Sequence, residues 1–404
     1  AAAHAAVPAA RAGLPRVKPS LTRWLFHEEP ASARLTVPIL DVDPDRGVTV
    51  GASSTWFLVS SGTTRSIHAP AATYNTVVGP AASYDYYLFP TTRSQLEAYA
   101  NVSRRSDREE LLEASGSPGP DDALGWTVHL QDLRDGARRF YGVGPRSTED
   151  AATDYTLDSL NESLGLSLRP PDHRAWVLSL SEHVEGVRIL PGPASLPDVD
   201  TLHPGSAGSP DRHTDAAARL ALDYDTRDST LSPRKGMDAQ AYVDAARRRW
   251  LSDYSYLRYG GELRLFVPLT EGRAPGALLA FQGRAEALDA DLPFWLMPSL
   301  GGKHSLRAYG AGRYVDDFMA STQAELRLRA GRAVIAGAVV SFWVDPFVGA
   351  GVVAPDGWHV VWETVRPSYG LSLRAVSRPQ VVVSADLGLG QEGPKVFIDM
   401  TESF

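Results

Sequence analysis

The chain contains no cysteine among its 404 residues, which excludes disulfides, thiolate nucleophiles and cysteine-ligated metals. It also has no surplus of positive charge, since 40 Lys and Arg stand against 48 Asp and Glu, a net charge of -8. This balance offers no electrostatic basis for binding nucleic acid. The absence of cysteine suits an oxidising compartment such as the periplasm or the outer membrane, although many cytosolic chains share it.

Long hydrophobic runs are missing as well. No window approaches the roughly 18 consecutive apolar residues that a transmembrane helix requires. Charged residues such as Arg264, Glu325 and Asp345 interrupt every apolar stretch. The alanine-rich start, 1–6, resembles what remains beside a small-residue cleavage site, so we expect an exported, mature chain. Any passage through a membrane must therefore use strands.

The sequence instead alternates polar and apolar residues with a period of two, which is typical of strands that have one apolar face. The polar rows carry Arg, Glu, Asp and Gln in strand after strand, as a wet or salt-bridged lumen requires. Clear examples lie at 96–103, 238–245, 262–267, 323–329 and 380–387. A soluble β-sandwich also alternates, so a large soluble β protein remains the alternative at this point.

The alternation predicts an all-β fold, a 16-stranded antiparallel transmembrane β-barrel over 34–404, preceded by a partly flexible periplasmic segment, 1–33. External loops are expected at about 105–152, 187–214 and 289–316, opposite short turns, which is how outer-membrane barrels are built. The range 124–134 is an alternative site for an extra hairpin strand. The predicted strands are 34–42, 48–60, 66–78, 82–90, 94–104, 153–169, 174–186, 215–224, 236–247, 255–269, 275–288, 317–329, 333–351, 359–376, 379–389 and 396–404.

Several motifs, most of them in the second half of the chain, resemble those of one family, the BamA/TamA superfamily of outer-membrane assembly and secretion barrels (bacterial surface antigen type). In that family the sixth external loop folds back into the lumen and carries an Arg-Gly-Phe-type tip. The motifs are Leu300-Gly301-Gly302, Leu306-Arg307-Ala308-Tyr309, Arg313-Tyr314-Val315-Asp316, Leu222-Asp223-Tyr224-Asp225-Thr226-Arg227-Asp228 before Pro233 and Gly236, Phe342-Trp343-Val344-Asp345 before Gly349 and Gly351, Phe140-Tyr141-Gly142-Val143-Gly144, and the terminal Phe404.

The resemblance implies that Arg307 is inserted in the lumen and pairs there with acidic groups. The alternation separately places Glu325 on an inward face, and Asp345 also points inward if the residues on either side of it face lipid. A guanidinium in a narrow, partly dehydrated lumen needs such carboxylates. The simpler alternative is that Arg307 only locks the loop. Ala308 stands where the family usually has glycine, so a glycine-only backbone conformation is in doubt there.

The resemblance also implies a function: insertion or secretion of proteins, or anchoring of a partner complex, at the outer membrane through the seam between the first and last strands. Pro38 lacks a backbone donor, so we expect a seam that is short on hydrogen bonds. Fewer residues precede the first predicted strand than a POTRA domain needs, which points to a barrel-only branch and a separate periplasmic or lipoprotein partner. The alternative is a passive pore or a purely structural barrel. The expected seam residues are Val37, Pro38, Ile39, Ile398, Met400 and Phe404.

No set of residues predicts catalysis, a metal or a cofactor. The stretch Gly388–Gly393 spells G-x-G-x-x-G, but it lies between two strands without a following helix, so we expect a tight hairpin. Asp223, Asp225 and Asp228 lack the glycine and terminal glutamate of a calcium loop and fit a turn instead. We therefore expect a protein of the lipid bilayer that is not an enzyme, and we treat a soluble enzyme as a distant alternative.

Overall fold

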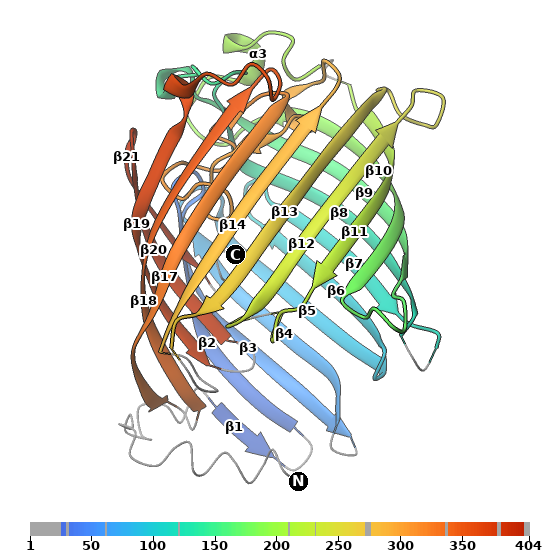
Figure 1. Ribbon diagram of the computed structural model, residues 1–404, viewed down its shortest axis with the longest axis vertical. Helices are drawn as coiled ribbons and strands as arrows, with labels where there is room; N and C mark the ends of the chain where they lie inside the picture. Colours follow the sequence, from blue (N-terminus) through green and yellow to red (C-terminus); the bar gives the residue numbers. More distant parts are fainter. Residues whose placement is uncertain are drawn as a thin grey trace.

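The computed structural model describes residues 26–29, 32–60, 63–119, 122–208, 211–230, 232–270, 276–335, 338–377 and 381–399. Nineteen strands form one antiparallel sheet. The first, β1 (Phe26–Glu29), is a short addition, and the other eighteen close into a barrel of tilted strands (Figure 1).

Each barrel strand pairs with its neighbours in sequence. The strands are β2 (Ser32–Asp43), β3 (Gly47–Ser60), β4 (Thr63–Asn75), β5 (Gly79–Thr91), β6 (Ser94–Ser103), β7 (Arg108–Gly116), β8 (Leu124–Phe140), β9 (Thr153–Leu168), β10 (Trp176–Pro191), β11 (His213–Asp225), β12 (Gly236–Ala246), β13 (Tyr256–Pro268), β14 (Ala277–Leu288), β17 (Phe318–Ile335), β18 (Ala338–Ala354), β19 (Arg366–Ser377), β20 (Val381–Gly390) and β21 (Gly393–Asp399).

The predicted count of sixteen strands is therefore wrong, because the range expected to be a long external loop, 105–152, contains the hairpin β7–β8. The polar stretch Glu109–Glu113 lies within that predicted loop but forms the middle of β7. In β7, acidic side chains occupy both faces, so the period of two is not visible in the sequence. In β8, an irregularity between Asp135 and Arg138 shifts the alternation. The alternative prediction of an extra strand at 124–134 is confirmed, since β8 covers this range.

The two ends of the barrel differ. The loop end carries the long connections, 192–212 with the helix α3 (Val199–Leu202), and 289–317 with the small sheet β15 (Ser299–Leu300) and β16 (Tyr314–Val315). The turn end carries the shorter connections, and β1 lies there (Figure 1). The added hairpin makes 289–317 the seventh connection at the loop end, where the sequence predicted the sixth. None of the helices in the described ranges is long and apolar enough to cross a bilayer.

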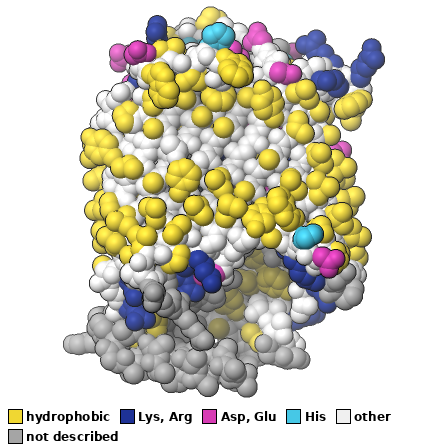
Figure 2. Space-filling model, in the orientation of Figure 1, with side chains coloured by type: hydrophobic (Ala, Val, Ile, Leu, Met, Phe, Trp, Pro, Cys, Tyr) yellow, Lys and Arg dark blue, Asp and Glu magenta, His cyan; other side chains and the backbone are white. Residues whose placement is uncertain are grey.

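The outer wall is apolar and the inner wall is polar. Outward side chains such as Leu166 and Leu180 are 67% and 57% exposed, whereas inward ones such as Asp244, Gln282 and Gln323 are buried. Apolar side chains cover the wall, and charged ones gather towards the two ends (Figure 2). Because so large an exposed apolar surface would be unfavourable in water, this surface fits a lipid environment.

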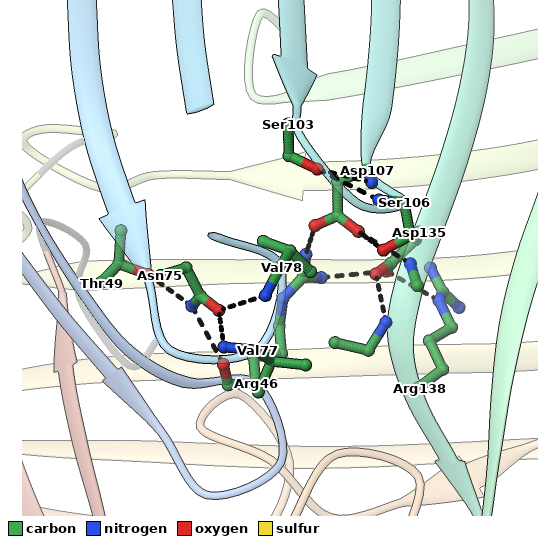
Figure 3. A network of polar contacts seen from close by, with 12 residues as sticks. Arg46, Thr49, Asn75, Val77, Val78, Ser103, Ser106, Asp107, Asp135 and Arg138 are labelled. Atoms are coloured by element: carbon green, nitrogen blue, oxygen red, sulfur yellow. Dashed lines mark hydrogen bonds and ion pairs between the residues drawn. The ribbon is translucent and has the colours of Figure 1, made fainter. Parts of the chain in front are cut away.

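A polar network ties the added hairpin to the start of the barrel (Figure 3). Arg46, in the turn between β2 and β3, donates to Asp135 of β8 at 2.9 Å and to Asp107 before β7 at 3.1 Å. The carbonyl of Arg46 accepts from Asn75 at 3.0 Å, and Asp135 also accepts from Arg138 Nε at 2.9 Å. Three connections at the loop end are thus held to one another and to β8.

Candidate functional site

The connection 289–317, hereafter the lumen loop, folds into the barrel and packs on the strands that follow it. Its apolar side chains are almost wholly removed from solvent and cluster with two residues of the barrel wall. The cluster consists of Leu300, Leu306, Ala308, Tyr309, Tyr314, Met319 of β17 and Val353 of β18. An apolar patch inside an otherwise polar lumen is stable only when it is covered, so this cluster holds the loop to the wall.

Glycines on the wall make room for the tip of the loop. A Cβ at Gly388 of β20 would lie 2.2 Å from the carbonyl oxygen of Arg307, and one at Gly390 would lie 2.8 Å from Cβ of Ala308. A Cβ at Gly351 of β18 would meet the side chain of Leu300 at 2.6 Å. Only glycine permits the loop backbone to approach this closely. Gly388 and Gly390 are two of the three glycines of the G-x-G-x-x-G spelling, a stretch that here joins β20 to β21 through a two-residue hairpin.

Arg307 is fully buried at the tip of the lumen loop. Its Nε donates to Gln323 at 3.0 Å, and its Nη1 donates both to Glu325 of β17 and, at 3.3 Å, to Asp386 of β20. The guanidinium lies 3.6 Å from the ring centroid of Phe347. One arginine therefore joins two strands that are three positions apart in the sheet, with a cation–π contact on its face.

The charges around Arg307 balance. Glu325 also accepts from Arg327 Nε at 2.8 Å, and Asp345 accepts from Arg374 and, at 3.1 Å, from the backbone N–H of Leu328. The group contains three arginines and three carboxylates, namely Arg307, Arg327, Arg374, Glu325, Asp345 and Asp386. Lys303 adjoins it 3.9 Å from Asp386 and is balanced by its own partner, Asp399. Neutral groups of this kind are tolerated in a dehydrated interior because no charge is left unpaired.

The structure brings Arg307 and Glu325 together, whereas a direct contact of Arg307 with Asp345 stays a prediction. Sequence reasoning did not single out Arg327, Arg374 or Asp386. The alternation placed Arg327 and Asp386 in the polar rows, but the register that makes partners of positions 307 and 386 is set by strands far apart in the sequence. No local pattern carries that information.

The lumen loop is also fixed to the last hairpin. Lys303 forms an ion pair with Asp399 of β21 and donates to Ser384 of β20 at 2.7 Å. Arg313 Nε and the hydroxyl of Tyr314 donate to Glu392 in the β20–β21 turn at 3.0 and 2.9 Å. The loop therefore holds the strand that closes the barrel.

The barrel closes between β2 and β21. Val42 and Ile398 form a registered pair of this seam, close to the end of the described part of β21 at Asp399. β1 pairs with β2 over Ser32–Leu35. Because β3 pairs along the whole of β2, β1 and β21 share its other edge.

Of the remaining predicted seam residues, three lie in β2 and two lie outside the described residues. Val37, Pro38 and Ile39 lie in β2, between the part paired with β1 and the part paired with β21. Pro38 is exposed and has no backbone N–H to donate. Met400 and Phe404 lie outside the described residues.

The aspartates that were considered as a calcium loop stabilise a turn instead of forming a metal site. Asp228 accepts from the backbone N–H groups of Arg234 and Lys235, at 2.8 and 3.3 Å, and Asp225 binds Arg227, so these carboxylates stabilise a turn. The described residues contain no group of three or more metal-ligating side chains.

Comparison with known proteins gives a family and a fold. The family model described as the Omp85 superfamily domain matches residues 96–391. No curated protein sequence matches the chain. A solved structure of BamA from Haemophilus ducreyi, lacking POTRA domains 1–3, is similar at a TM-score of 0.56 and 15% identity, over 94% of this chain and 76% of that one. CdiB from Acinetobacter baumannii aligns at a TM-score of 0.48 and 12% identity, over 92% of this chain and 60% of that one.

Proposed function

This chain belongs to the Omp85 superfamily and is an integral β-barrel of the outer membrane, and from that premise we propose that it assists the insertion or secretion of proteins there through the β2/β21 seam. Barrels of this family are generally transport and assembly proteins rather than enzymes. The lipid bilayer is its immediate surroundings. A separate periplasmic or lipoprotein partner that delivers the client remains part of the proposal.

The observation that carries this proposal is the shared edge of β2, which meets β1 at one part and the closing strand β21 at another. Val42 of β2 pairs with Ile398 of β21, while Ser32–Leu35 of the same strand pair with β1, so two different strands meet one edge of β2. Sideways opening requires that the ladder between β2 and β21 breaks, and each of its backbone hydrogen bonds contributes on the order of 1 kcal/mol. Pro38 removes one further donor from the same strand.

The edge of β2 also accepts an added strand. β1 is antiparallel to β2 and pairs with four of its residues, Ser32–Leu35, beside the part that meets β21. A client strand could add to this edge in the same way, because the backbone groups of an open edge bind any extended chain. In this proposal β1 occupies part of the edge until a client displaces it.

The lumen loop would link the seam to the rest of the barrel. Lys303 and Asp399 connect the loop to β21, and Arg307 connects it to β17 and β20. A movement of β21 away from β2 would therefore either carry the loop along or break these ion pairs. The buried loop tip fits a passive pore less well, because it fills space that a steady current would need.

A reversible covalent lock across the seam tests the proposal. Val42 and Ile398 are directly opposite, at a spacing that a disulfide can bridge, and the chain has no cysteine of its own. The double variant Val42→Cys/Ile398→Cys would be reconstituted in liposomes with an unfolded eight-stranded outer-membrane barrel as client. The fraction of folded client would be read from its heat-modifiable mobility on a gel.

We expect the oxidised lock to reduce client folding to the level of empty liposomes and reduction to restore it. The matched control is Val42→Cys/Val48→Cys, which joins β2 to β3 at the same height and leaves the seam free. Full activity of the oxidised seam lock would contradict the proposal.

A further inference from the structure

A groove of about 1030 Å³ lies on the outer wall of β7–β10, near the loop end of the barrel. A row of outward positions crosses these four strands at one height. The register places Arg108 of β7 opposite Arg134 of β8, Arg134 opposite Asp158 of β9, and Asp158 opposite Arg188 of β10. Exposed apolar residues, among them Leu130 and Leu160, line the groove on the same face.

Positive charge exceeds negative charge among the residues that line this groove. The outward part of the groove is lined by five arginines and three carboxylates, namely Arg105, Arg108, Arg134, Arg188, Arg212, Asp132, Asp158 and Glu162. The further carboxylate at the groove, Asp107, is engaged with Arg46.

The carboxylates do not reach every arginine. Asp158 pairs with both Arg188, at 2.7 Å, and Arg212, at 3.1 Å, while Asp132 pairs with Arg108. Arg134 has no carboxylate partner among the residues that the structure describes. Its cross-strand neighbours are Arg108 of β7 and Asp158 of β9, and Asp158 is engaged by Arg188 and Arg212. Like charges directly opposite one another, as at Arg108 and Arg134, destabilise a sheet. An anion between the two would relieve this repulsion.

The row lies at the height expected for lipid headgroups. Trp126 lies on β8, eight residues from Arg134, and Trp176 lies on β10, twelve residues from Arg188. Both tryptophans are near the turn end. At a rise of about 3.4 Å per residue and a tilt of about 40°, these separations are about 20–30 Å along the barrel axis. The apolar band of an outer-membrane barrel is about 25 Å tall and is flanked by aromatic residues.

We propose that this groove binds a phosphorylated, multi-acylated lipid of the outer leaflet. Arg134, with Arg108 and Arg188 beside it, would hold a phosphate, since a guanidinium matches phosphate oxygens in pairs. The acyl chains would lie on the apolar wall along Leu130 and Leu160. This site is independent of the proposed function, because β7–β10 lie across the barrel from the β2/β21 seam.

Native mass spectrometry of the full chain in detergent tests this proposal, with lipid A and its dephosphorylated form as probes. We expect Arg134→Gln to weaken the binding of lipid A about tenfold, the loss of one charge-assisted contact, and to leave the dephosphorylated lipid unchanged. Arg65→Gln is the matched control, an exposed arginine at the turn end, and should bind as wild type does.

Two outcomes would overturn the proposal. Equal binding of lipid A by wild type and Arg134→Gln would show that the row does not recognise the phosphate. Displacement of lipid A by millimolar inorganic phosphate would show that the site takes the free anion and not the lipid. Heat-modifiable mobility of each variant establishes that it is folded, and we expect no change for Arg134→Gln because its side chain has no partner among the described residues.

Discussion

Arg307 and Glu325 form an ion pair in the lumen of the barrel, with side chains that are 0% and 2% exposed. They come from different elements, the lumen loop and β17, and the pair belongs to a group whose charges cancel. It is the contact that fixes the buried end of the loop most directly.

Removing the charge of Arg307 should destabilise the barrel. Arg307→Met keeps much of the length of the side chain but removes one cationic partner each from the buried carboxylates Glu325 and Asp386. This should lower the free energy of unfolding by about 3 kcal/mol or more. The free energy of unfolding, from urea denaturation in detergent micelles, measures this. The control Arg65→Met removes an exposed arginine and should change stability by less than about 1 kcal/mol. Equal effects of the two changes would count against a structural role of the pair.

Arg307→Ala should also change conductance. With the tip of the loop held in place, single-channel recordings of wild type in planar bilayers should show small currents. Loss of the contacts to Gln323, Glu325 and Asp386 should free the loop and give larger, fluctuating currents. Large, steady and equal conductance in both proteins would rule out a lumen that is filled by this loop.

A side chain at Gly388 should displace the loop without touching a charge. The added Cβ of Gly388→Val would lie 2.2 Å from a backbone oxygen of Arg307, closer than atoms can pack. Trypsin should then cleave after Arg307 or Arg313, which are buried in the wild-type protein. Gly331→Val is the matched control on β17, where a Cβ would meet nothing within 4 Å. The close packing of the tip would be in question if both variants resisted trypsin equally.

Asp317, at the end of the lumen loop, should make stability depend on pH. Burial, and then the charges of Asp316 and Asp291, raise the pKa of its carboxyl to about 6. The folded protein therefore binds a proton more tightly than the unfolded chain, whose pKa is near 3.8. Stability contributed by this group is complete below about pH 4 and is lost as pH rises through about 6.

Asp317→Asn should accordingly flatten the fall in urea midpoint between pH 4.5 and pH 7. The control is Asp172→Asn, a change at an exposed turn, which should keep the wild-type slope. A wild-type slope in Asp317→Asn would show that the proton is bound elsewhere.

The sequence predicted the class of the fold and the membrane it occupies, because alternation reports which face of each strand meets lipid. Membership of the family, expected from the motifs around Arg307, is confirmed by the family model. The number of strands was wrong by one hairpin, since Glu109, Glu110 and Glu113 hide the alternation in β7. The position of the charged row at Arg134 along the barrel axis could not be predicted from the sequence either. It depends on the register of four strands and not on the spacing within one.

The long-range partners of the lumen loop could not be predicted either. Asp386 lies 79 residues from Arg307, and Asp399 lies 96 residues from Lys303. Such pairs follow only once the order and register of β17–β21 are known. Alternation identifies which side chains enter the lumen, and the closure of the sheet decides which of them meet.

Cross-linking of a client at the seam tests the central proposal most directly. A cysteine at Ile39 lies in the part of β2 between the pairings with β1 and β21, and a cysteine at Leu180 of β10 lies on the far side of the barrel. Each variant would be mixed with a client barrel that carries one cysteine in its last strand, during insertion into liposomes. We expect a disulfide between the client and Ile39→Cys that forms as the client inserts, and none with Leu180→Cys. Insertion without a cross-link at position 39, or with equal cross-linking at both positions, would contradict a role for the seam.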